Sequence, residues 1–462
     1  MNRNTLLARR RLSTLSLAVV CAGLVSHSPA KAQTTPAKAD STERSVATSA
    51  EMPALNQPTV RKNLFAFEAL ADKSRKLRLA SLATLAPEDK KEEPAGPKPG
   101  DLAITGLLDW YYGVNTRAPG HTPYVTPSGD TINIDNNGRA FDVKDRQPGF
   151  SLGEVNITRT PGKGFGLGLT ATLTIGDTAR LVHATEPGGT ANYSALQQLY
   201  VTGSPKLLGR DLTVDAGVFA TPFGYEVIES SSNDNYSRSF NFALGVPLYH
   251  AGVRATTTLN PKWSLQAGIV NGWNNIADDN NAKSLYAQFT YKAGTKFTNI
   301  LGWMGGAEGT GAFGAGVPTA GGGGVTMNLL DWQAILTPTE KLKLVGWFTY
   351  GSAAGSIQNV GAVSGNWLGM TGIARYQVTP SLAWAARIEQ FEDMPGTGGF
   401  APRLGLGYSN LKSYTLTLEY TLKSLVSRLE WRHDTANQAV FNSASGAVAD
   451  QDTITLGQVY KF

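Results

Sequence analysis

The chain has 462 residues, of which 41% are hydrophobic and 17% are charged, and it contains 51 Gly and one Cys. A single cysteine excludes a disulfide scaffold and a cysteine-based zinc site, and the sequence has no run of roughly 18 apolar residues that would form a helical membrane span. The net charge of +5 comes from residues 1–32, which carry basic residues and no acid, leaving 36 acidic residues balanced by the rest of the Lys and Arg. The balanced remainder excludes a nucleic-acid-binding surface based on overall charge.

Residues 1–32 have the features of an export signal. Arginines at 9–11 precede a mildly apolar stretch, residues 12–25, and Ala30 and Ala32 are the small residues expected before a cleavage site. This combination is typical of a secretory signal peptide, so we expect residues 1–32 to be removed. A lipid anchor on Cys21 is less well supported, because bulky Val20 precedes it, and the surroundings of the arginines match a twin-arginine signal poorly.

Residues 33–100 are rich in Ala, Lys, Glu, Pro and Ser and show no strand-like alternation. The segment 87–100 is charged and rich in Pro and Gly, a composition that cannot bury a core. We therefore predict a flexible periplasmic leader and linker over residues 33–100 and a single domain over residues 101–462.

From residue 101 onward, apolar residues alternate with small or polar ones. In one such segment Tyr414, Leu416 and Leu418 alternate with Thr415 and Thr417. A period of two places the two sets on opposite faces of a strand. About sixteen segments of this kind have the length of tilted transmembrane strands, which predicts an all-β fold, a transmembrane antiparallel β-barrel of about 16 strands.

The connections between these segments alternate between short and long, which is typical of outer-membrane barrels. Short connections are expected at residues 160–164, 204–210, 260–262, 293–296, 338–341, 379–381 and 423–424, and long ones at residues 115–147, 222–246, 308–326, 394–410 and 435–451. An even number of strands places both ends of the barrel domain on the side of the short turns.

Aromatic residues lie near the strand ends or on the apolar face, where we expect them to contact lipid headgroups. They are Trp110, Tyr112, Trp263, Trp347, Phe348, Tyr350, Trp367, Trp384, Tyr414, Tyr420, Trp431 and Tyr460. Charged residues occupy the opposite face, because charges are costly in lipid and comfortable in water. The predicted pore-lining residues are Asp215, Arg254, Arg375, Arg387, Glu389, Glu419, Arg428, Glu430 and Arg432. Their mixed signs predict weak ion selectivity and do not identify a preference for anions or cations.

The last strand places Ile454, Leu456, Tyr460 and the terminal Phe462 on one face. A terminal Phe with an aromatic residue two positions earlier resembles the signal that the outer-membrane assembly machinery recognises. We therefore expect three features of the protein's setting: location in the outer membrane of a Gram-negative bacterium, contact with its lipid, and assembly through the strand that ends at Phe462. A homotrimer is compatible with a barrel of this size, although the sequence identifies no interface.

The loop after the fifth strand and the residues that follow it carry four distinctive elements. Phe-Gly-Tyr-Glu at residues 223–226 and Asn-Tyr-Ser-Arg-Ser at 235–239 lie in the loop, and His-Ala-Gly-Val at 250–253 and Val-Asn-Gly-Trp at 270–273 come after it. In these elements the chain resembles the OmpL-like family of outer-membrane β-barrel porins. The resemblance covers residues 101–462 and implies a porin-type barrel, without a defined substrate.

The segment 222–246 contains five residues that we predict as pore-constriction candidates: Glu226, Glu229, Asp234, Tyr236 and Arg238. If the segment folds into the lumen, these groups narrow the channel and set its field, as rings of charge do in other pores. The alternative is an ordinary external loop with solvated charges.

We predict no enzymatic activity, no cofactor and no metal. His121, His183, His250 and His433 show no catalytic or metal-ligand spacing. The function predicted from sequence is passive diffusion of small hydrophilic solutes or ions through a water-filled barrel. The alternative is a non-conducting adhesin or scaffold whose long external loops bind partners.

Overall fold

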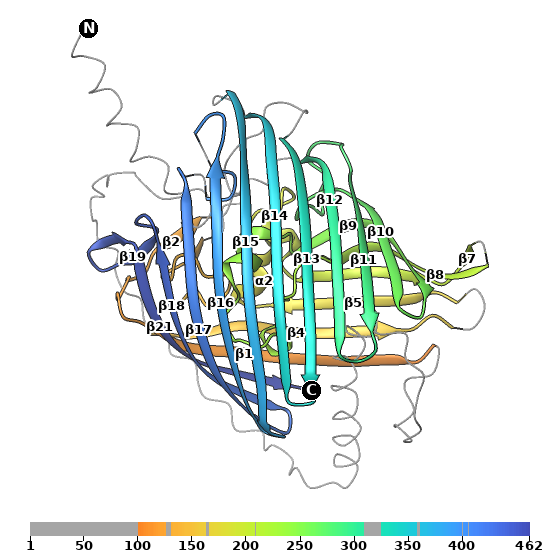
Figure 1. Cartoon of the computed structure of the whole chain (residues 1–462), viewed down its shortest axis with the longest axis horizontal. Helices are drawn as coiled ribbons and strands as arrows, with labels where there is room; N and C mark the ends of the chain where they lie inside the picture. Colours follow the sequence, from red (N-terminus) through yellow and green to blue (C-terminus); the bar gives the residue numbers. More distant parts are fainter. Residues whose placement is uncertain are drawn as a thin grey trace, which may run out of the picture.

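The computed structural model describes residues 100–125, 131–162, 166–207, 209–308, 325–357, 361–399, 401–404 and 406–462. Sixteen long antiparallel strands form a closed barrel (Figure 1). They are β1 (Leu102–Asn115), β4 (Pro148–Arg159), β5 (Gly168–Ile175), β6 (Leu196–Gly203), β8 (Arg210–Ala220), β9 (Tyr249–Asn260), β10 (Trp263–Val270), β11 (Ser284–Ala293), β12 (Phe297–Glu308), β13 (Val325–Thr339), β14 (Leu342–Ile357), β15 (Gly361–Thr379), β16 (Leu382–Pro395), β17 (Ser409–Leu422), β18 (Leu425–Ala436) and β21 (Asp450–Lys461). The fold class and strand number predicted from the alternation are confirmed.

The first and last strands close the barrel. β1 pairs with β4 on one side and with β21 on the other, with Leu108 opposite Tyr460. At the end of the chain, the Phe462 N–H donates to the Gly106 carbonyl at 3.0 Å, and the Gly106 N–H donates to the Phe462 carbonyl at 2.8 Å. Closure gives every strand two partners, which a sheet in lipid requires because no water is present to satisfy a free edge.

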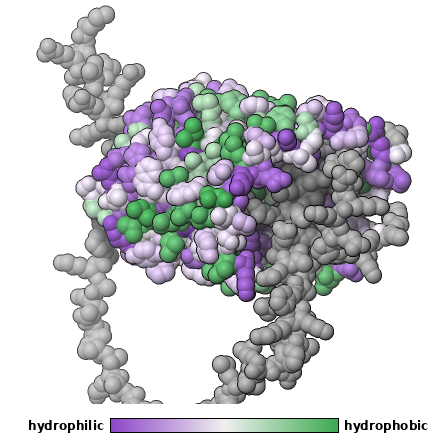
Figure 2. All heavy atoms as spheres, turned by 60° about the horizontal axis from the view of Figure 1, so that its bottom comes forward, coloured by the Kyte–Doolittle hydropathy of each residue, from purple (hydrophilic) through white to green (hydrophobic). Residues whose placement is uncertain are grey.

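The two faces of the wall differ as the alternation predicts. On β17, Tyr414, Leu416 and Tyr420 are exposed on the outside, whereas Ser413 and Thr417 are buried inside. Figure 2 shows hydrophobic residues on the outer wall of the barrel. Contact with lipid favours apolar side chains on the outside of a barrel. The wall therefore presents apolar groups to the membrane and polar groups to the interior.

Two of the predicted lipid-facing aromatics point the other way, and this part of the prediction was wrong. Trp347 is 2% exposed and Trp367 is 0% exposed, and both lie inside the barrel. The Trp347 indole N–H donates to Asp331 at 2.6 Å, and that of Trp367 donates to the Gly245 carbonyl at 3.1 Å. A buried indole N–H needs an acceptor, and here the acceptors come from the wall and from an inward-folded loop.

The short turns lie at one end of the barrel, together with the start of β1 and the end of β21 (Figure 1). The opposite end carries the long connections at residues 116–147, 176–195, 221–248, 271–283, 396–408 and 437–449. The long connection predicted at residues 308–326 lies, between residues 309 and 324, outside the described residues. One connection departs from the expected alternation, since only residues 358–360 separate β14 from β15 at the long-loop end. The asymmetry otherwise follows the prediction.

The long connections contain small elements of their own. These are β2 (Pro123–Val125) and β3 (Thr131–Asn133), α2 (Asp177–Val182) and α3 (Thr190–Tyr193), the helical turns η2 (Ser230–Ser232) and η3 (Asn241–Gly245), and the hairpin of β19 (Phe441–Ser443) and β20 (Gly446–Val448). The two-residue strand β7 (Lys206–Leu207) belongs to a short turn. Buried apolar side chains from several long connections, with others from the wall, form one cluster inside the barrel. Sixteen strands enclose more space than wall side chains fill, and the connections occupy part of it.

Among the described residues, no helix has the length and apolar character needed to cross a bilayer.

Candidate functional site: a loop inside the barrel

Residues 221–248, which we call the lumen loop, connect β8 to β9 and fold into the barrel. All five sequence-predicted constriction residues belong to this loop, and each is at most 5% exposed: Glu226, Glu229, Asp234, Tyr236 and Arg238. The structure therefore brings these five together inside the barrel. The alternative, in which this segment forms an external loop with solvated charges, does not agree with the burial of these residues.

The lumen loop contacts the wall on opposite sides. Wall residues that bond to it include Asp109 on β1, Gln197 on β6, Asp331 on β13, Arg387 on β16 and Glu430 on β18, and each is at most 2% exposed. A loop that bonds to β6, to β13 and to β18 crosses the interior. At this height the interior is therefore narrow, because loop atoms occupy the space between the walls.

β16 holds the centre of the loop through a buried cation. The Arg387 guanidinium donates to Glu226 at 2.6 Å and to the Ser237 carbonyl at 2.6 Å. Glu389, two residues further on the same face of the strand, accepts the Phe240 N–H at 2.5 Å. Because alternate residues on a strand share a face, one strand supplies both a cation and an anion to the loop.

β18 repeats this arrangement with two arginines around one glutamate. Glu430 accepts the backbone N–H groups of Tyr236 at 2.6 Å and Ser237 at 3.0 Å. Arg428 donates to the carbonyls of Ser230, Asn233 and Asn235, and Arg432 donates to the Arg238 carbonyl at 2.5 Å. The loop backbone is thus held by charged wall groups, and hydrogen bonds to charged partners are stronger than neutral ones.

The sequence pattern did not identify several anchors of the loop on other strands. On β1, Asp109 accepts hydrogen bonds from the Tyr236 hydroxyl at 2.8 Å and the Ser230 hydroxyl at 2.5 Å. On β14, the Lys343 ammonium lies 2.6 Å from Asp234. Both wall residues lie on the inward face, so the alternation contains a signal for them, but it does not reveal their partners.

The remaining predicted pore-lining residues also face the interior, in two groups. Arg254 on β9 lies 2.8 Å from Asp215 on β8. Arg375 on β15 lies 2.6 Å from Glu419 on β17, and Glu419 also accepts Arg428 at 2.6 Å. These charges are paired with each other, either between neighbouring strands or, for Arg375 and Glu419, across the intervening strand β16, which neutralises them locally.

Glycines in the wall give the loop room. A Cβ atom built on Gly457 would lie 2.3 Å from the Tyr236 ring, and one built on Gly369 would lie 2.0 Å from the Asn241 side-chain oxygen. Such distances are far shorter than a carbon contact allows. The absence of a side chain at these two inward positions creates notches into which Tyr236 and Asn241 fit.

Gly457→Val is expected to destabilise the protein by about 1–3 kcal/mol, because the new side chain overpacks against the Tyr236 ring. The measurement is thermal unfolding of the detergent-solubilised barrel. Gly346→Val is the matched control, since a Cβ at Gly346 has nothing within 4 Å. Equal unfolding temperatures for the two variants would show that Tyr236 does not occupy the notch.

The four histidines of residues 101–462 belong to different elements: His121 and His183 to long connections, His250 to β9 and His433 to β18. His250 is buried, with Nδ1 2.9 Å from the Gly272 carbonyl and Nε2 3.1 Å from the Thr221 hydroxyl. His433 lies on the outer face, 3.0 Å from Asp452, and its ring stacks on Trp431. No group of three or more metal-ligating side chains occurs among the residues with described positions.

His183, beyond the end of α2, makes the long-loop end sensitive to acid. Burial lowers its pKa from 6.5 to about 4, so the folded segment holds this ring neutral. Between pH 6.5 and 4 the opened segment binds the proton more tightly, and folded stability therefore falls as the pH is lowered, by up to about 3 kcal/mol. We expect amide hydrogen exchange over residues 177–193, corrected for intrinsic rates, to be faster at pH 4.5 than at pH 7.

The control for this prediction is His183→Phe, which keeps a ring against Tyr249, 4.6 Å away between centroids in the native protein, and removes the titrating group. Its corrected exchange is expected to be the same at the two pH values. Acid-dependent exchange that persists in the variant would assign the effect to another group.

Comparisons with known proteins agree with this architecture. The family model described as "Putative beta-barrel porin-2, OmpL-like" matches residues 101–462. A search of curated protein sequences gave no match. Among solved structures, the chain is similar to the outer membrane channel DcaP of Acinetobacter baumannii, with 11% identity over 80% of this chain and 100% of that chain and a TM-score of 0.50.

It is also similar to the anion-selective porin from Comamonas acidovorans, with 13% identity over 79% of this chain and 100% of that chain and a TM-score of 0.50. Salmonella typhi OmpF in complex with daunomycin gives 13% identity over 79% of this chain and 98% of that chain, with a TM-score of 0.51. At these identities the solved structures show a shared fold. With the family match over the whole barrel, they identify the chain as a member of the OmpL-like β-barrel porin family, located in the outer membrane of a Gram-negative bacterium.

Proposed function

We propose that the protein is a channel for passive diffusion of small hydrophilic solutes across the outer membrane, and that the lumen loop is its constriction. The observation that carries this proposal is the path of the loop, which crosses a sixteen-stranded barrel while bonded to wall residues on several sides. A barrel of this width without the loop would hold a wide aqueous channel. The loop therefore limits the size of the solutes that pass.

The constriction residues would set the field through fixed charges of both signs. Glu226 and Asp234 of the loop lie beside Arg387 and Lys343 of the wall. Paired charges of this kind hold the loop in place and leave a small net field. The proposed channel accordingly selects more by size than by the sign of the charge.

Single-channel recording in planar bilayers tests the proposal. The purified protein is expected to give discrete conductance steps that are small for a sixteen-stranded barrel, because the lumen loop crosses the interior and occupies part of the cross-section. A membrane that contains the inserted protein and shows no steps at any voltage would overturn the proposal.

The same recording separates the channel from a non-conducting adhesin or scaffold. The observation that favours the scaffold is the deep burial of the wall residues at the height of the loop, such as Asp331 and Arg387. A scaffold gives no steps in the native chain, whereas a constricted channel gives small ones.

Further parts of the proposal concern segments and partners around the barrel. Residues 1–32 would act as a signal peptide and residues 33–100 as a leader, and residues 1–99 lie outside the described residues. The assembly machinery would recognise β21 and Phe462, whose ring lies 6.4 Å from that of Tyr460, and the barrel would form a homotrimer. We propose no catalysis. Hydrolysis of lipids or peptides by the native protein that is lost in His250→Ala or His433→Ala would contradict this.

A further inference from the structure

The short turns at one end of the barrel carry charges of almost one sign. Five of the seven short connections contain a lysine, and the described residues of all seven include one acid, Glu340. The five lysines are exposed, and they are Lys206, Lys262, Lys296, Lys341 and Lys423. Because each turn joins two neighbouring strands of the closed sheet, these residues form an incomplete ring around one rim, which we call the lysine ring.

Four members of the lysine ring have no partner of opposite charge. Lys206 lies 3.4 Å from Asp211, whereas the other four form no ion pair with any residue whose position the structure describes. An exposed ammonium group of this kind offers three donors to an acceptor from outside the chain. The lysine ring therefore presents a net positive charge to its surroundings.

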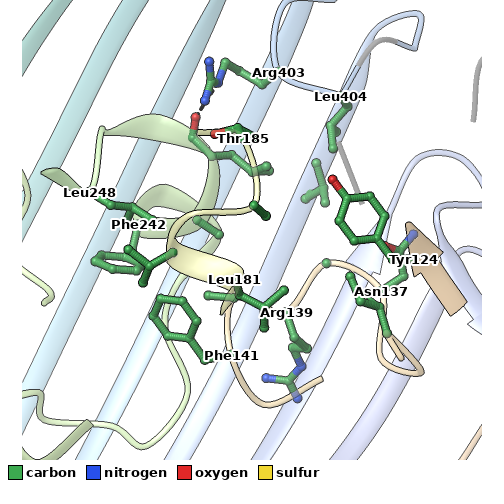
Figure 3. Close-up of a pocket in the computed structure, with 18 of the residues that line it drawn as sticks. Tyr124, Asn137, Arg139, Phe141, Leu181, Thr185, Phe242, Leu248, Arg403 and Leu404 are labelled. Atoms are coloured by element: carbon green, nitrogen blue, oxygen red, sulfur yellow. Dashed lines mark hydrogen bonds between the residues drawn. The ribbon is translucent and has the colours of Figure 1, made fainter. Parts of the chain in front are cut away.

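The long-loop end, by contrast, is balanced in charge. Among the described residues of its connections, acidic and basic residues occur in nearly equal numbers. On its surface the Arg146 guanidinium lies 3.0 Å from Asp145. In its interior, part of which Figure 3 shows, Arg139 lies 3.2 Å from Asp142. The excess of unpaired positive charge is therefore a property of the short-turn end.

Aromatic residues place the lysine ring at the level of the lipid headgroups. The exposed Trp263 directly follows Lys262, and its ring lies 4.8 Å from that of Tyr291. The exposed Tyr420 precedes Lys423 by three residues. Trp and Tyr gather where a membrane meets water, because each combines an apolar ring with one polar group. The rim that carries the lysines therefore lies at this boundary.

Lysine side chains reach the headgroup layer from the turns. A strand rises about 3.3 Å per residue, so Lys423 lies within about 10 Å of Tyr420 along the chain. A lysine lays its four-carbon stem along apolar surface and keeps its ammonium group in the polar layer. The lysine ring is therefore placed to meet the phosphate groups of lipids that surround the barrel.

We infer that the lysine ring binds phospholipids whose headgroups carry a net negative charge, in the leaflet that faces the periplasm. Short turns of outer-membrane barrels lie on the periplasmic side, and each lysine near a membrane surface adds to the attraction for anionic lipid. The aromatic residues beside the ring favour lipid over a soluble acidic protein, because they hold this rim in the headgroup layer. Lipid binding needs no conductance, so the inference is independent of the proposed channel.

Native mass spectrometry of the full chain in detergent tests the inference with two lipids of equal chain length. Phosphatidylglycerol carries one net negative charge, and phosphatidylcholine carries none. The Kd of the first bound phosphatidylglycerol is expected to be about fivefold below that of phosphatidylcholine, which corresponds to one lysine near the headgroup. Glycerol 3-phosphate, which has the phosphate without the acyl chains, is expected not to displace the bound lipid.

Two matched variants of the four unpaired lysines locate the binding. The Gln variant, Lys262→Gln/Lys296→Gln/Lys341→Gln/Lys423→Gln, removes the charge, and the Kd values of the two lipids are expected to become equal. The Arg variant, Lys262→Arg/Lys296→Arg/Lys341→Arg/Lys423→Arg, keeps the charge, and the fivefold difference is expected to remain. All four positions are exposed and lie in turns, so both variants are expected to fold as the native chain does.

Three results would overturn the inference: equal Kd values for the two lipids in the native chain, a fivefold difference that persists in the Gln variant, or displacement of the lipid by glycerol 3-phosphate. The last result would make the lysine ring a site for soluble phosphates. Conductance measured on the same preparation reports on the channel alone, so failure of one proposal is distinguishable from failure of the other.

Discussion

Replacing residues 222–246 with a short Gly/Ser linker is expected to raise the single-channel conductance several-fold. The replaced segment contains all five constriction residues and crosses the interior between β6, β13 and β18. Once it is removed, the charged wall residues that now bond to it, such as Arg387 and Glu430, face water, which solvates them without a protein partner. Planar-bilayer recording of native and linker variants under the same salt conditions is the measurement.

Deleting residues 443–446 at the tip of the β19–β20 hairpin is the control for a general effect of loop shortening. This tip is half-buried or exposed and bonds mainly within itself and to Arg117. Its removal is expected to leave the conductance unchanged. Equal conductance in the native chain and in the linker variant would show that the lumen loop does not restrict the permeation path.

Arg387→Met is expected to lower the free energy of unfolding by about 3–5 kcal/mol, because it leaves Glu226 charged, buried and without its cation. Glu226 and Arg387 are 3% and 1% exposed, with 2.6 Å between their charged atoms. Thermal unfolding in detergent measures the loss. We also expect noisier single-channel currents, since Arg387 no longer holds the Ser237 carbonyl.

The double variant Arg387→Met/Glu226→Gln separates an unpaired charge from lost packing. The amide is neutral and still offers an oxygen to the Ser239 N–H, which donates to Glu226 at 2.7 Å in the native chain. The double variant is expected to be more stable than Arg387→Met alone. An exposed pair supplies the comparison: Arg117→Met, opposite Asp450 on the surface, is expected to cost no more than about 1 kcal/mol.

The alternation in the sequence determines much of the wall. In β17 the apolar residues Tyr414, Leu416 and Leu418 alternate with polar residues. This period of two assigns the two faces of the strand without any knowledge of its partners. In β14 both faces carry apolar residues around Trp347 and Phe348, so the pattern cannot tell the lipid side from the interior. The direction of Trp347 is decided by Asp331, which lies on the neighbouring strand.

The candidate site could be predicted in part for a similar reason. The composition of the segment after the fifth strand left an inward loop and an external loop both open, and the five constriction candidates in it are buried in the interior. What it pairs with could not be inferred, because Lys343 and Asp234, like Asp109 and Tyr236, are more than a hundred residues apart in sequence. Inward charges could be located from the pattern, whereas their bonding to the loop depends on the closed fold.

Solute entry into liposomes that contain the native protein or the linker variant tests most directly whether the barrel is a channel constricted by the lumen loop. Swelling in isosmotic solutions of a pentose and of a trisaccharide reports which sizes pass. The native protein is expected to admit the pentose faster than the trisaccharide, and the linker variant is expected to admit both. Swelling no faster than that of protein-free liposomes, for both solutes and both proteins, would contradict the claim that this barrel is a channel constricted by residues 221–248.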